Sequence, residues 1–213
     1  PIFPNLFRFN YDVSVDMELS EAIAGEAGEL GLRTTMMRNP DFRVDYGTIT
    51  SCHLSYPDWD VPLVVISSAR PYYYYSNEYG DAEMLALGDA TRRAIEKTGK
   101  RAVLLASTSL SHRHFTDEPE DPEDPSFESI YNSNQRAWDD RILAMIRAGE
   151  GARILAEMPD FIQQSVSECR DGGFTWLLSA LGVPDYPGNV HGYGSVIGTG
   201  NAIVEWTPPE VQA

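Results

Sequence analysis

Apolar and polar residues follow two patterns along this chain, one typical of amphipathic helices and one typical of buried strands. Residues 17–32 are rich in Ala, Glu and Leu with apolar positions at helical spacing, which predicts a helix. The run 61–67 (VPLVVIS) is almost entirely apolar, as expected of a strand buried on both faces. Residues 83–98 predict a helix that ends at Gly99, and 101–107 (RAVLLAS) predict a second buried strand.

The remaining segments extend the same alternation. Residues 44–51 contain β-branched and aromatic residues and predict a strand or a strand-edge turn, whereas the Gly-punctuated segment 192–206 predicts a closing strand or hairpin. Further helices are expected at 136–148, 153–157, 160–169 and 174–181, with Gly182 as the last stop. Helices that alternate with buried strands indicate an α/β fold in which a central mixed or parallel sheet is flanked by helices. We expect residues 1–213 to form a single domain.

Charge and cysteine content narrow the class of protein. The 32 acidic and 16 basic residues give a formal charge of -16, which disfavours nucleic acid and anionic membranes as partners. Part of this charge lies in 117–128 (DEPEDPEDPSFE), which has the composition of a solvated loop. No apolar run approaches the roughly 18–20 residues of a membrane span. Two cysteines exclude a disulfide-rich scaffold, so a reduced, cytoplasmic setting is the simplest expectation.

The clearest candidate for chemistry follows the second predicted strand. His112 and His114 lie in the segment STSLSHRHF, at the end of a strand where α/β folds gather their ligands. Histidine is the side chain best suited to proton transfer near neutral pH. The alternative is that one of these histidines only hydrogen-bonds the loop, and position alone does not name a reaction.

The other candidates are weaker. His191 is most simply a turn residue, and His53 is either a buried, hydrogen-bonded histidine or a pocket residue, of which we favour the first. The four histidines form no short metal-binding pair. Residues 192–200 contain several glycines, but a nucleotide loop needs a helix after it, and NAIVEW predicts a strand instead. Tyr72–Tyr75 are more typical of packing or interface residues than of a substrate platform.

An ordered set of segments nevertheless resembles a known family. LLASTSLSH, ending at His112, is similar to the SGGLSH signature of the class III (LigB-type) extradiol dioxygenases. FRVDYGT stands at the place of that family's Asp-His-Gly turn, and PLVVIS at the strand that follows it. With MMRNPDFRVDYGTIT and VIGTGNA, the pattern is most similar to the catalytic subunits that cleave aminophenols.

This resemblance implies Fe(II)-dependent ring cleavage of 2-aminophenol, or a related aminophenol or catechol, with O2, giving 2-aminomuconate 6-semialdehyde from 2-aminophenol. It implies that His112 is the catalytic acid/base. Tyr46 stands where relatives often have a second histidine, so its phenol is expected to bind the substrate's ring substituent or bound oxygen. Glu168, on a late helix before Trp176, is the implied metal carboxylate, with Glu205 as the second choice.

The resemblance also implies what this chain does not contain. The family's two iron-binding histidines come from a segment upstream of anything that matches Pro1, and the sequence does not begin with Met. The alternatives are that the N-terminal part is a separate piece or that this is a metal-free relative. We favour an N-terminally incomplete chain, which we expect to bind iron weakly or not at all by itself. The family further implies a homologous partner subunit, in a heterotetramer. Because such dioxygenases pair active with inactive subunits, a non-catalytic structural subunit is the alternative function.

Overall fold

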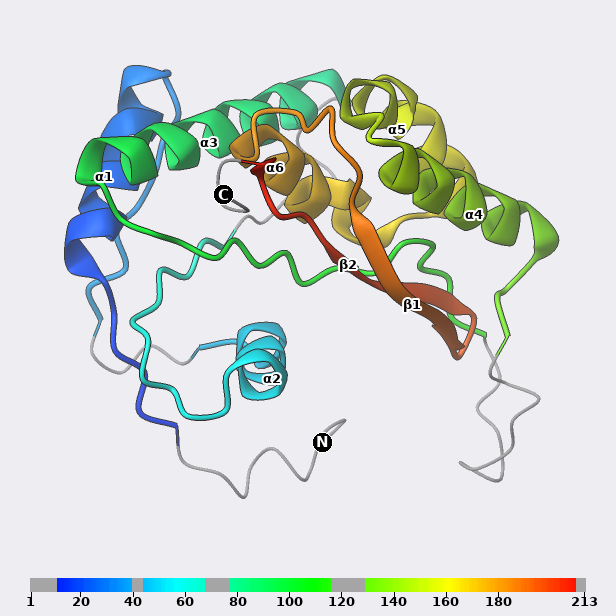
Figure 1. The fold of residues 1–213 in the computed structure, drawn as a ribbon, viewed down its shortest axis with the longest axis horizontal. Helices are drawn as coiled ribbons and strands as arrows, with labels where there is room; N and C mark the ends of the chain where they lie inside the picture. Colours follow the sequence, from blue (N-terminus) through cyan, green and yellow to red (C-terminus); the bar gives the residue numbers. More distant parts are fainter. Residues whose placement is uncertain (1–10, 40–43, 68–76, 116–128, 210–213) are drawn as a thin grey trace. The chain divides into compact units, whose positions relative to one another are not determined.

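The computed structural model describes residues 11–39, 44–67, 77–115 and 129–209. Within them lie six α-helices, one 3-10 helix and a two-stranded antiparallel sheet (Figure 1). The chain divides into two compact units, each of which we describe by itself. Unit 1 comprises Pro1–Ala69 and Ala90–Ser107, and unit 2 comprises Arg70–Asp89 and Thr108–Ala213. The expectation of a single domain stays a prediction. The acidic segment 117–128 and Tyr72–Tyr75 fall outside the described residues.

Unit 1 is built on two helices that share a small core. Helix α1 (Met17–Glu29) begins where the Asp16 carboxylate accepts the N–H of Leu19, a standard N-terminal cap. Its buried positions Leu19 and Ile23 pack with Ala94 of helix α3 (Asn77–Thr98), which passes from one unit into the other. The helices expected at 17–32 and 83–98 are therefore confirmed.

The strand or turn expected at 44–51 is wrong. Tyr46–Ser55 form helix α2, because the Asp45 carboxylate accepts hydrogen bonds from both the N–H and the hydroxyl of Thr48. This cap satisfies a backbone donor that would otherwise lack a partner at the start of the helix, and it outweighs the strand preference of the β-branched residues.

The two expected buried strands are extended, but they are not part of a described sheet. In 61–67, only Leu63 pairs, in a parallel bridge with Val15, and Val61 remains 57% exposed. In 101–107, Val103 is 93% exposed. The α/β family fold is therefore represented in the described residues by helices and one hairpin, and the central mixed or parallel sheet stays a prediction.

Unit 2 contains the larger core. Helix α4 (Ser133–Ala148) is capped by the Asn132 side chain and ends at Gly149, whose φ of 73° is easy only for glycine. Helix α5 (Gly151–Ser165) continues through Pro159, so the two helices expected at 153–157 and 160–169 are one helix that stops earlier. A proline inside a helix removes a hydrogen bond. Burial of Met158 and Phe161 on either side holds the helix together across it.

A hairpin completes this core. Strands β1 (Asn189–Val196) and β2 (Thr199–Glu205) confirm the hairpin expected near 192–206 and the rejection of a nucleotide loop there. Their two-residue turn has positive φ at Ile197 and Gly198, as a tight hairpin with right-handed twist requires. Together with helix α6 (Gly172–Ala180), the hairpin packs on the cluster around Ile142 and Ile146 (Figure 1).

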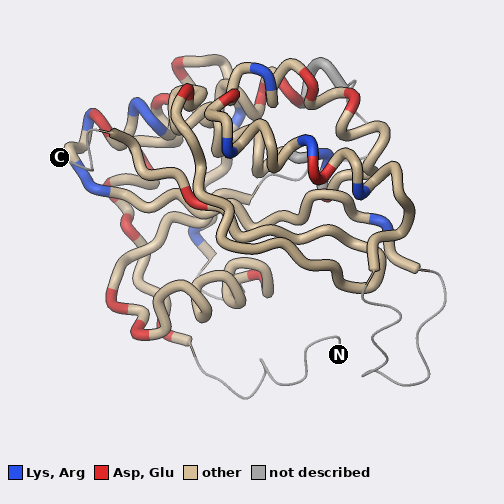
Figure 2. Tube along the Cα trace, turned by 45° about the vertical axis from the view of Figure 1, so that its right-hand side comes forward, with Lys and Arg blue, Asp and Glu red and all other residues tan. Residues whose placement is uncertain are grey.

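Charges are concentrated on the helices, whereas most of the extended chain carries none (Figure 2). This distribution leaves the hairpin and the segments beside it free for packing and for polar contacts of other kinds. None of the described helices has the length and apolar character needed to cross a membrane.

Candidate functional site

The segment Thr108–His112 lies in unit 2 between the hairpin and the chain that follows helix α5. On one side, the N–H of Leu110 donates to the carbonyl of Gly200 at 2.8 Å, and the N–H of Gly200 donates to Ser111 at 2.9 Å. On the other side, the N–H of His112 donates to the carbonyl of Val166 at 3.2 Å. The segment is thus held like a short central strand, although it is not assigned to a sheet.

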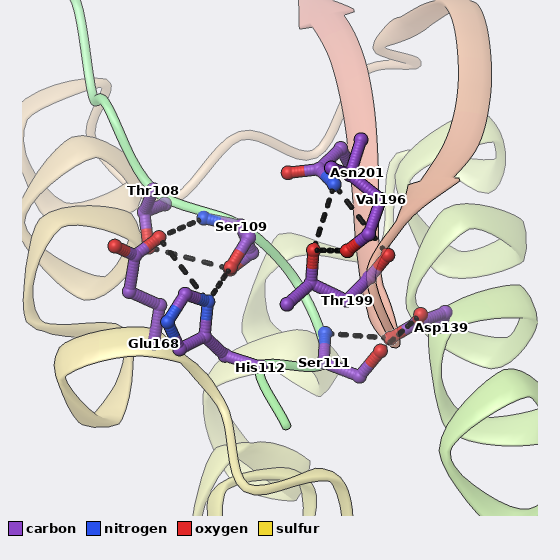
Figure 3. Close-up of polar contacts among 9 residues, drawn as sticks. All are labelled: Thr108, Ser109, Ser111, His112, Asp139, Glu168, Val196, Thr199 and Asn201. Atoms are coloured by element: carbon purple, nitrogen blue, oxygen red, sulfur yellow. Dashed lines mark hydrogen bonds and ion pairs between the residues drawn. The ribbon is translucent and has the colours of Figure 1, made fainter. Parts of the chain in front are cut away.

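His112 and Glu168 meet at this segment (Figure 3). Nδ1 of His112 lies 2.7 Å from the hydroxyl of Ser109 and 3.9 Å from Oε2 of Glu168. The same carboxylate oxygen accepts the backbone N–H of Ser109 at 2.6 Å. A histidine and a carboxylate that are far apart in sequence therefore share one buried serine between them.

The surroundings favour a neutral imidazole. Burial lowers the pKa of His112, and His114, whose ring stands edge-on at 4.8 Å, lowers it further, whereas Glu168 opposes both effects. If Nδ1–H donates to Ser109, the lone pair of Nε2 is the one that can accept a proton. Among the described residues none hydrogen-bonds Nε2 of His112.

Glu168 reaches this position through an unusual turn. It begins the 3-10 helix η3 (Glu168–Asp171), two residues after Val166, which ends α5 with a φ of 53°. Positive φ is unfavourable for a β-branched residue. This conformation turns the Val166 carbonyl towards the N–H of His112 and leads the chain to Glu168, so the local strain lies at the candidate site. The expected helix around Glu168 is thus a 3-10 turn.

The buried carboxylate of Asp139 holds the segment Thr108–His112 by hydrogen bonds to Ser111. Oδ1 of Asp139 accepts the N–H of Ser111 at 2.9 Å, and Oδ2 accepts the hydroxyl of Ser111 at 2.7 Å (Figure 3). Oδ2 also accepts the hydroxyl of Tyr193 at 2.7 Å. Both Asp139 and Ser111 are fully buried. Burial raises the pKa of Asp139, and these hydrogen bonds counteract the shift.

The remaining candidates are placed elsewhere. Tyr46 begins helix α2 in unit 1 and is 63% exposed, whereas His112 and Glu168 both lie in unit 2. The turn expected at His191 is wrong, because this histidine lies in strand β1. Its Nε2 is 2.8 Å from the carboxylate of Glu205, so Glu205 already has a partner on an exposed strand.

His53 occupies a different setting from the buried one that we favoured. It is partly exposed and lies in helix α2, where it lines an open hollow of about 450 Å³ in unit 1. Tyr11 and Trp59 border the same hollow, with the Tyr11 ring edge-on to His53 at 6.1 Å. The alternative of a pocket residue is therefore the one that the structure matches.

The family model described as the catalytic LigB subunit of aromatic ring-opening dioxygenase matches residues 4–202. The chain belongs to this family. The resemblance that the sequence motifs indicated is thereby confirmed, and with it the membership of a family of extradiol ring-cleaving dioxygenases.

Three curated relatives show to which dioxygenases this chain is similar. The chain is 52% identical over 206 residues to the 2-aminophenol 1,6-dioxygenase beta subunit of a Pseudomonas species, which covers 97% of this chain and 68% of that protein. It is 26% identical over 198 residues to the alpha subunit of 2-aminophenol 1,6-dioxygenase from Pseudomonas, covering 92% and 69%. It is also 26% identical over 188 residues to 3,4-dihydroxyphenylacetate 2,3-dioxygenase of Escherichia coli, covering 88% and 65%.

LigB family enzymes typically use Fe(II), so the donor atoms of the site can be tested against that ion. Non-haem Fe(II) sites of this kind use two histidines and one carboxylate on one face of the metal. Glu168 has the chemistry of the carboxylate ligand. Among the described residues, however, no group of three or more His, Cys, Asp and Glu side chains is placed to hold a metal ion. The described residues therefore fit one ligand position and do not complete the set.

Two residues of the site were not found from the sequence. Ser109 was not singled out within the segment STSLSHRHF, although it contacts both His112 and Glu168. Asp139 has a signal that could have been used: it lies on the same face of helix α4 as Gln135, Ile142 and Ile146, all buried. A carboxylate at helical spacing from apolar core positions indicates a buried charge with partners.

Proposed function

We propose that this chain is the ring-cleaving subunit of an extradiol dioxygenase that acts on 2-aminophenol or a related aminophenol or catechol with O2. The substrate class follows the 52% identity to the 2-aminophenol 1,6-dioxygenase beta subunit. That relative and the alpha subunit to which this chain is also similar support a homologous partner, in a heterotetramer. A cytoplasmic location stays part of the proposal.

The observation that carries the proposal is the meeting of His112 and Glu168 at Ser109. An acid/base group and a metal ligand must act on the same small substrate, so they must lie within a few ångströms of each other. These two side chains do so, although one follows an extended segment and the other begins a 3-10 helix.

Each residue has a separate task in this proposal. Nε2 of His112 takes the proton of the substrate's hydroxyl or amino group and later returns it, while Ser109 accepts Nδ1–H and holds the ring in that tautomer. Glu168 supplies one carboxylate ligand. The Tyr46 phenol binds the ring substituent. Fe(II), when bound, supplies open positions at which an aromatic substrate and O2 are held together.

The test is oxygen uptake with 2-aminophenol by the protein expressed from its complete coding sequence, together with its partner subunit and Fe(II). His112→Ala is expected to lower kcat by about 10²- to 10⁴-fold, the usual contribution of a general acid/base. His191→Ala is the matched control, because that histidine pairs with Glu205 on the exposed hairpin. Unchanged kcat in His112→Ala would contradict the proton-transfer role.

Metal content tests Glu168 independently of turnover. Glu168→Gln keeps the size of the side chain but removes its charge, so Fe(II) bound per protein after dialysis is expected to fall. Glu205→Gln, the second candidate, is expected to leave it unchanged. The reverse result would transfer the ligand role to Glu205.

The second candidate function is a non-catalytic structural subunit of a heteromeric dioxygenase. It is favoured by the finding that the described residues alone do not complete a metal site. It predicts that iron and activity both stay with the partner subunit when His112 and Glu168 are replaced. Equal activity of wild type and the double variant in the reconstituted complex would establish this alternative.

A further inference from the structure

Ser111, the residue before His112, is fixed to helix α4 at two points. The backbone N–H and the hydroxyl of Ser111 both donate to the Asp139 carboxylate. The carbonyl of Ser111 accepts the N–H of Gly200. Every polar group of Ser111 is therefore engaged, and its position leaves little freedom to the backbone of His112.

The carboxylate is itself held rigidly. Its Oδ2 accepts the Tyr193 hydroxyl at 2.7 Å, and the guanidinium of Arg136 stacks 4.5 Å from the centre of the Tyr193 ring. Gly200 closes the remaining side, since a Cβ at that residue would collide with Oδ2 of Asp139. A side chain in such close packing has one conformation available to it.

Burying the Asp139 carboxylate is unfavourable by itself, because taking a charge out of water costs several kcal/mol unless hydrogen bonds compensate. Here three hydrogen bonds do so, and two of them come from the neighbour of His112. An apolar residue at 139 would leave three donors, the N–H and hydroxyl of Ser111 and the hydroxyl of Tyr193, without this acceptor. What an apolar residue could not do is fix the hydroxyl and N–H of Ser111.

We propose that Asp139 is the positioning residue of the site: it fixes Ser111 and thereby sets the place from which His112 transfers its proton. This role rests on the acid/base function proposed above for His112. Asp139 acts through Ser111 and does not touch the substrate.

An asparagine at 139 separates geometry from charge. Its carbonyl oxygen can accept the Ser111 N–H, and its amide group can donate to the Ser111 and Tyr193 hydroxyls, which accept as well as donate. Asp139→Asn therefore keeps the network, whereas Asp139→Ala removes it. Arg147→Ala is the control on the same helix, because Arg147 is exposed in the last turn of α4 and takes no part in the network around Asp139.

The experiment measures kcat and KM for 2-aminophenol in the iron-loaded complex, and the imidazole ¹⁵N signals of His112 in the iron-free full-length protein. Asp139→Ala is expected to lower kcat by about 10²-fold, as misplacement of a catalytic group by about 1 Å can do, with KM changed less than about twofold. Its His112 signals should shift from one fixed tautomer towards an average of two. Asp139→Asn should restore kcat to within about threefold of wild type and keep the signals, and Arg147→Ala should change neither.

Folded Asp139→Ala with wild-type kcat and unchanged His112 signals would overturn the proposal. If that variant does not fold, Ser111→Ala decides, because it deletes the hydroxyl through which Asp139 holds Ser111: unchanged kcat and signals would again refute the role. If His112→Ala keeps full activity, the proposed function fails, but the ¹⁵N signals still show whether Asp139 positions His112. The two failures are thus distinguishable.

Discussion

Two consecutive pieces of the chain, 101–107 and 108–112, are both extended but differ in almost every other respect. The first is apolar and exposed, with Val103 at 93% and Leu105 at 46% exposure. The second is rich in hydroxyls and buried, with Ser109 at 5% and Ser111 at 0%. Hydropathy alone would assign the burial the other way round.

Hydrogen-bond partners explain the reversal. Residues 108–112 have a neighbour on each side, the hairpin at Gly200 and the chain at Val166, and Asp139 satisfies their polar groups. Between 101–107 and the other described segments, no backbone hydrogen bond is formed. An extended segment becomes buried when another segment pairs with it, so its own side chains predict only which face would be apolar.

The largest difference in the free energy of unfolding is expected between a leucine in the core and a leucine in the exposed segment 101–107. Leu178→Ala, at a position with 0% exposure, is expected to lower the free energy of unfolding by about 2–5 kcal/mol, because it removes packing and leaves a cavity. Leu105→Ala makes the same chemical change in the exposed segment and should cost less than about 1 kcal/mol. Urea unfolding followed by circular dichroism measures both.

Val103→Ala sharpens the same comparison, since this side chain has almost no contact to lose and should change stability by less than about 0.5 kcal/mol. If Leu105→Ala or Val103→Ala cost as much as Leu178→Ala, the segment would be buried in solution, and the contrast between the two pieces would disappear.

Periodicity in the sequence predicted the elements whose stability is local. Helix α3 and the hairpin were found because their apolar spacing and their glycines act within a few residues. The failures arose where other residues decide: Asp45 turns 46–55 into a helix, and the burial of 61–67 and 101–107 depends on segments that pair with them. The helices expected at 153–157 and 160–169 are one helix, in which burial of Phe161 holds the chain across Pro159.

The candidate site divides in the same way. His112 was predicted from its place after an apolar run, and Glu168 from a family resemblance; the described structure brings the two together. Asp139 was not found, because a carboxylate next to Asp140 on a helix is ordinarily exposed to solvent. Its helical spacing from the buried Ile142 and Ile146 and its tertiary contact with Ser111 distinguish the buried aspartate from its exposed neighbour.

A smaller effect is expected at the cap of helix α2, which buries only Cys52 among its residues and so depends on its cap. Asp45→Ala removes the acceptor for the Thr48 N–H and should destabilise the helix by about 1 kcal/mol. Asp45→Asn keeps an acceptor and is the control. Hydrogen exchange of the α2 amides measures the change, and equal protection in Asp45→Ala would show that packing, not the cap, holds this helix.

The smallest effect concerns the beginning of the exposed segment, where Lys100 donates to the Asp16 carboxylate at 2.9 Å. The backbone N–H of Asp16 also donates to the carbonyl of Leu63. Asp16 therefore contacts the segment 61–67 and the residue that directly precedes the segment 101–107. The hydrogen bond from the N–H of Leu19 and the one from Lys100 lower the pKa of Asp16. Its ionised form therefore stabilises the folded state above the pKa of the unfolded chain, and this contribution is lost as the pH falls through the lower, folded value.

Asp16→Asn keeps the cap on α1 but loses the attraction to Lys100. We expect it to be slightly less stable than wild type at pH 7, with the difference diminishing as the pH falls below the ordinary pKa of an aspartate, because the wild-type carboxyl is then being protonated. Urea midpoints across this range provide the measurement. A difference that persists undiminished at low pH would mean that the side chain acts by shape, and that the charge of Lys100 does not help to hold the first extended piece in place.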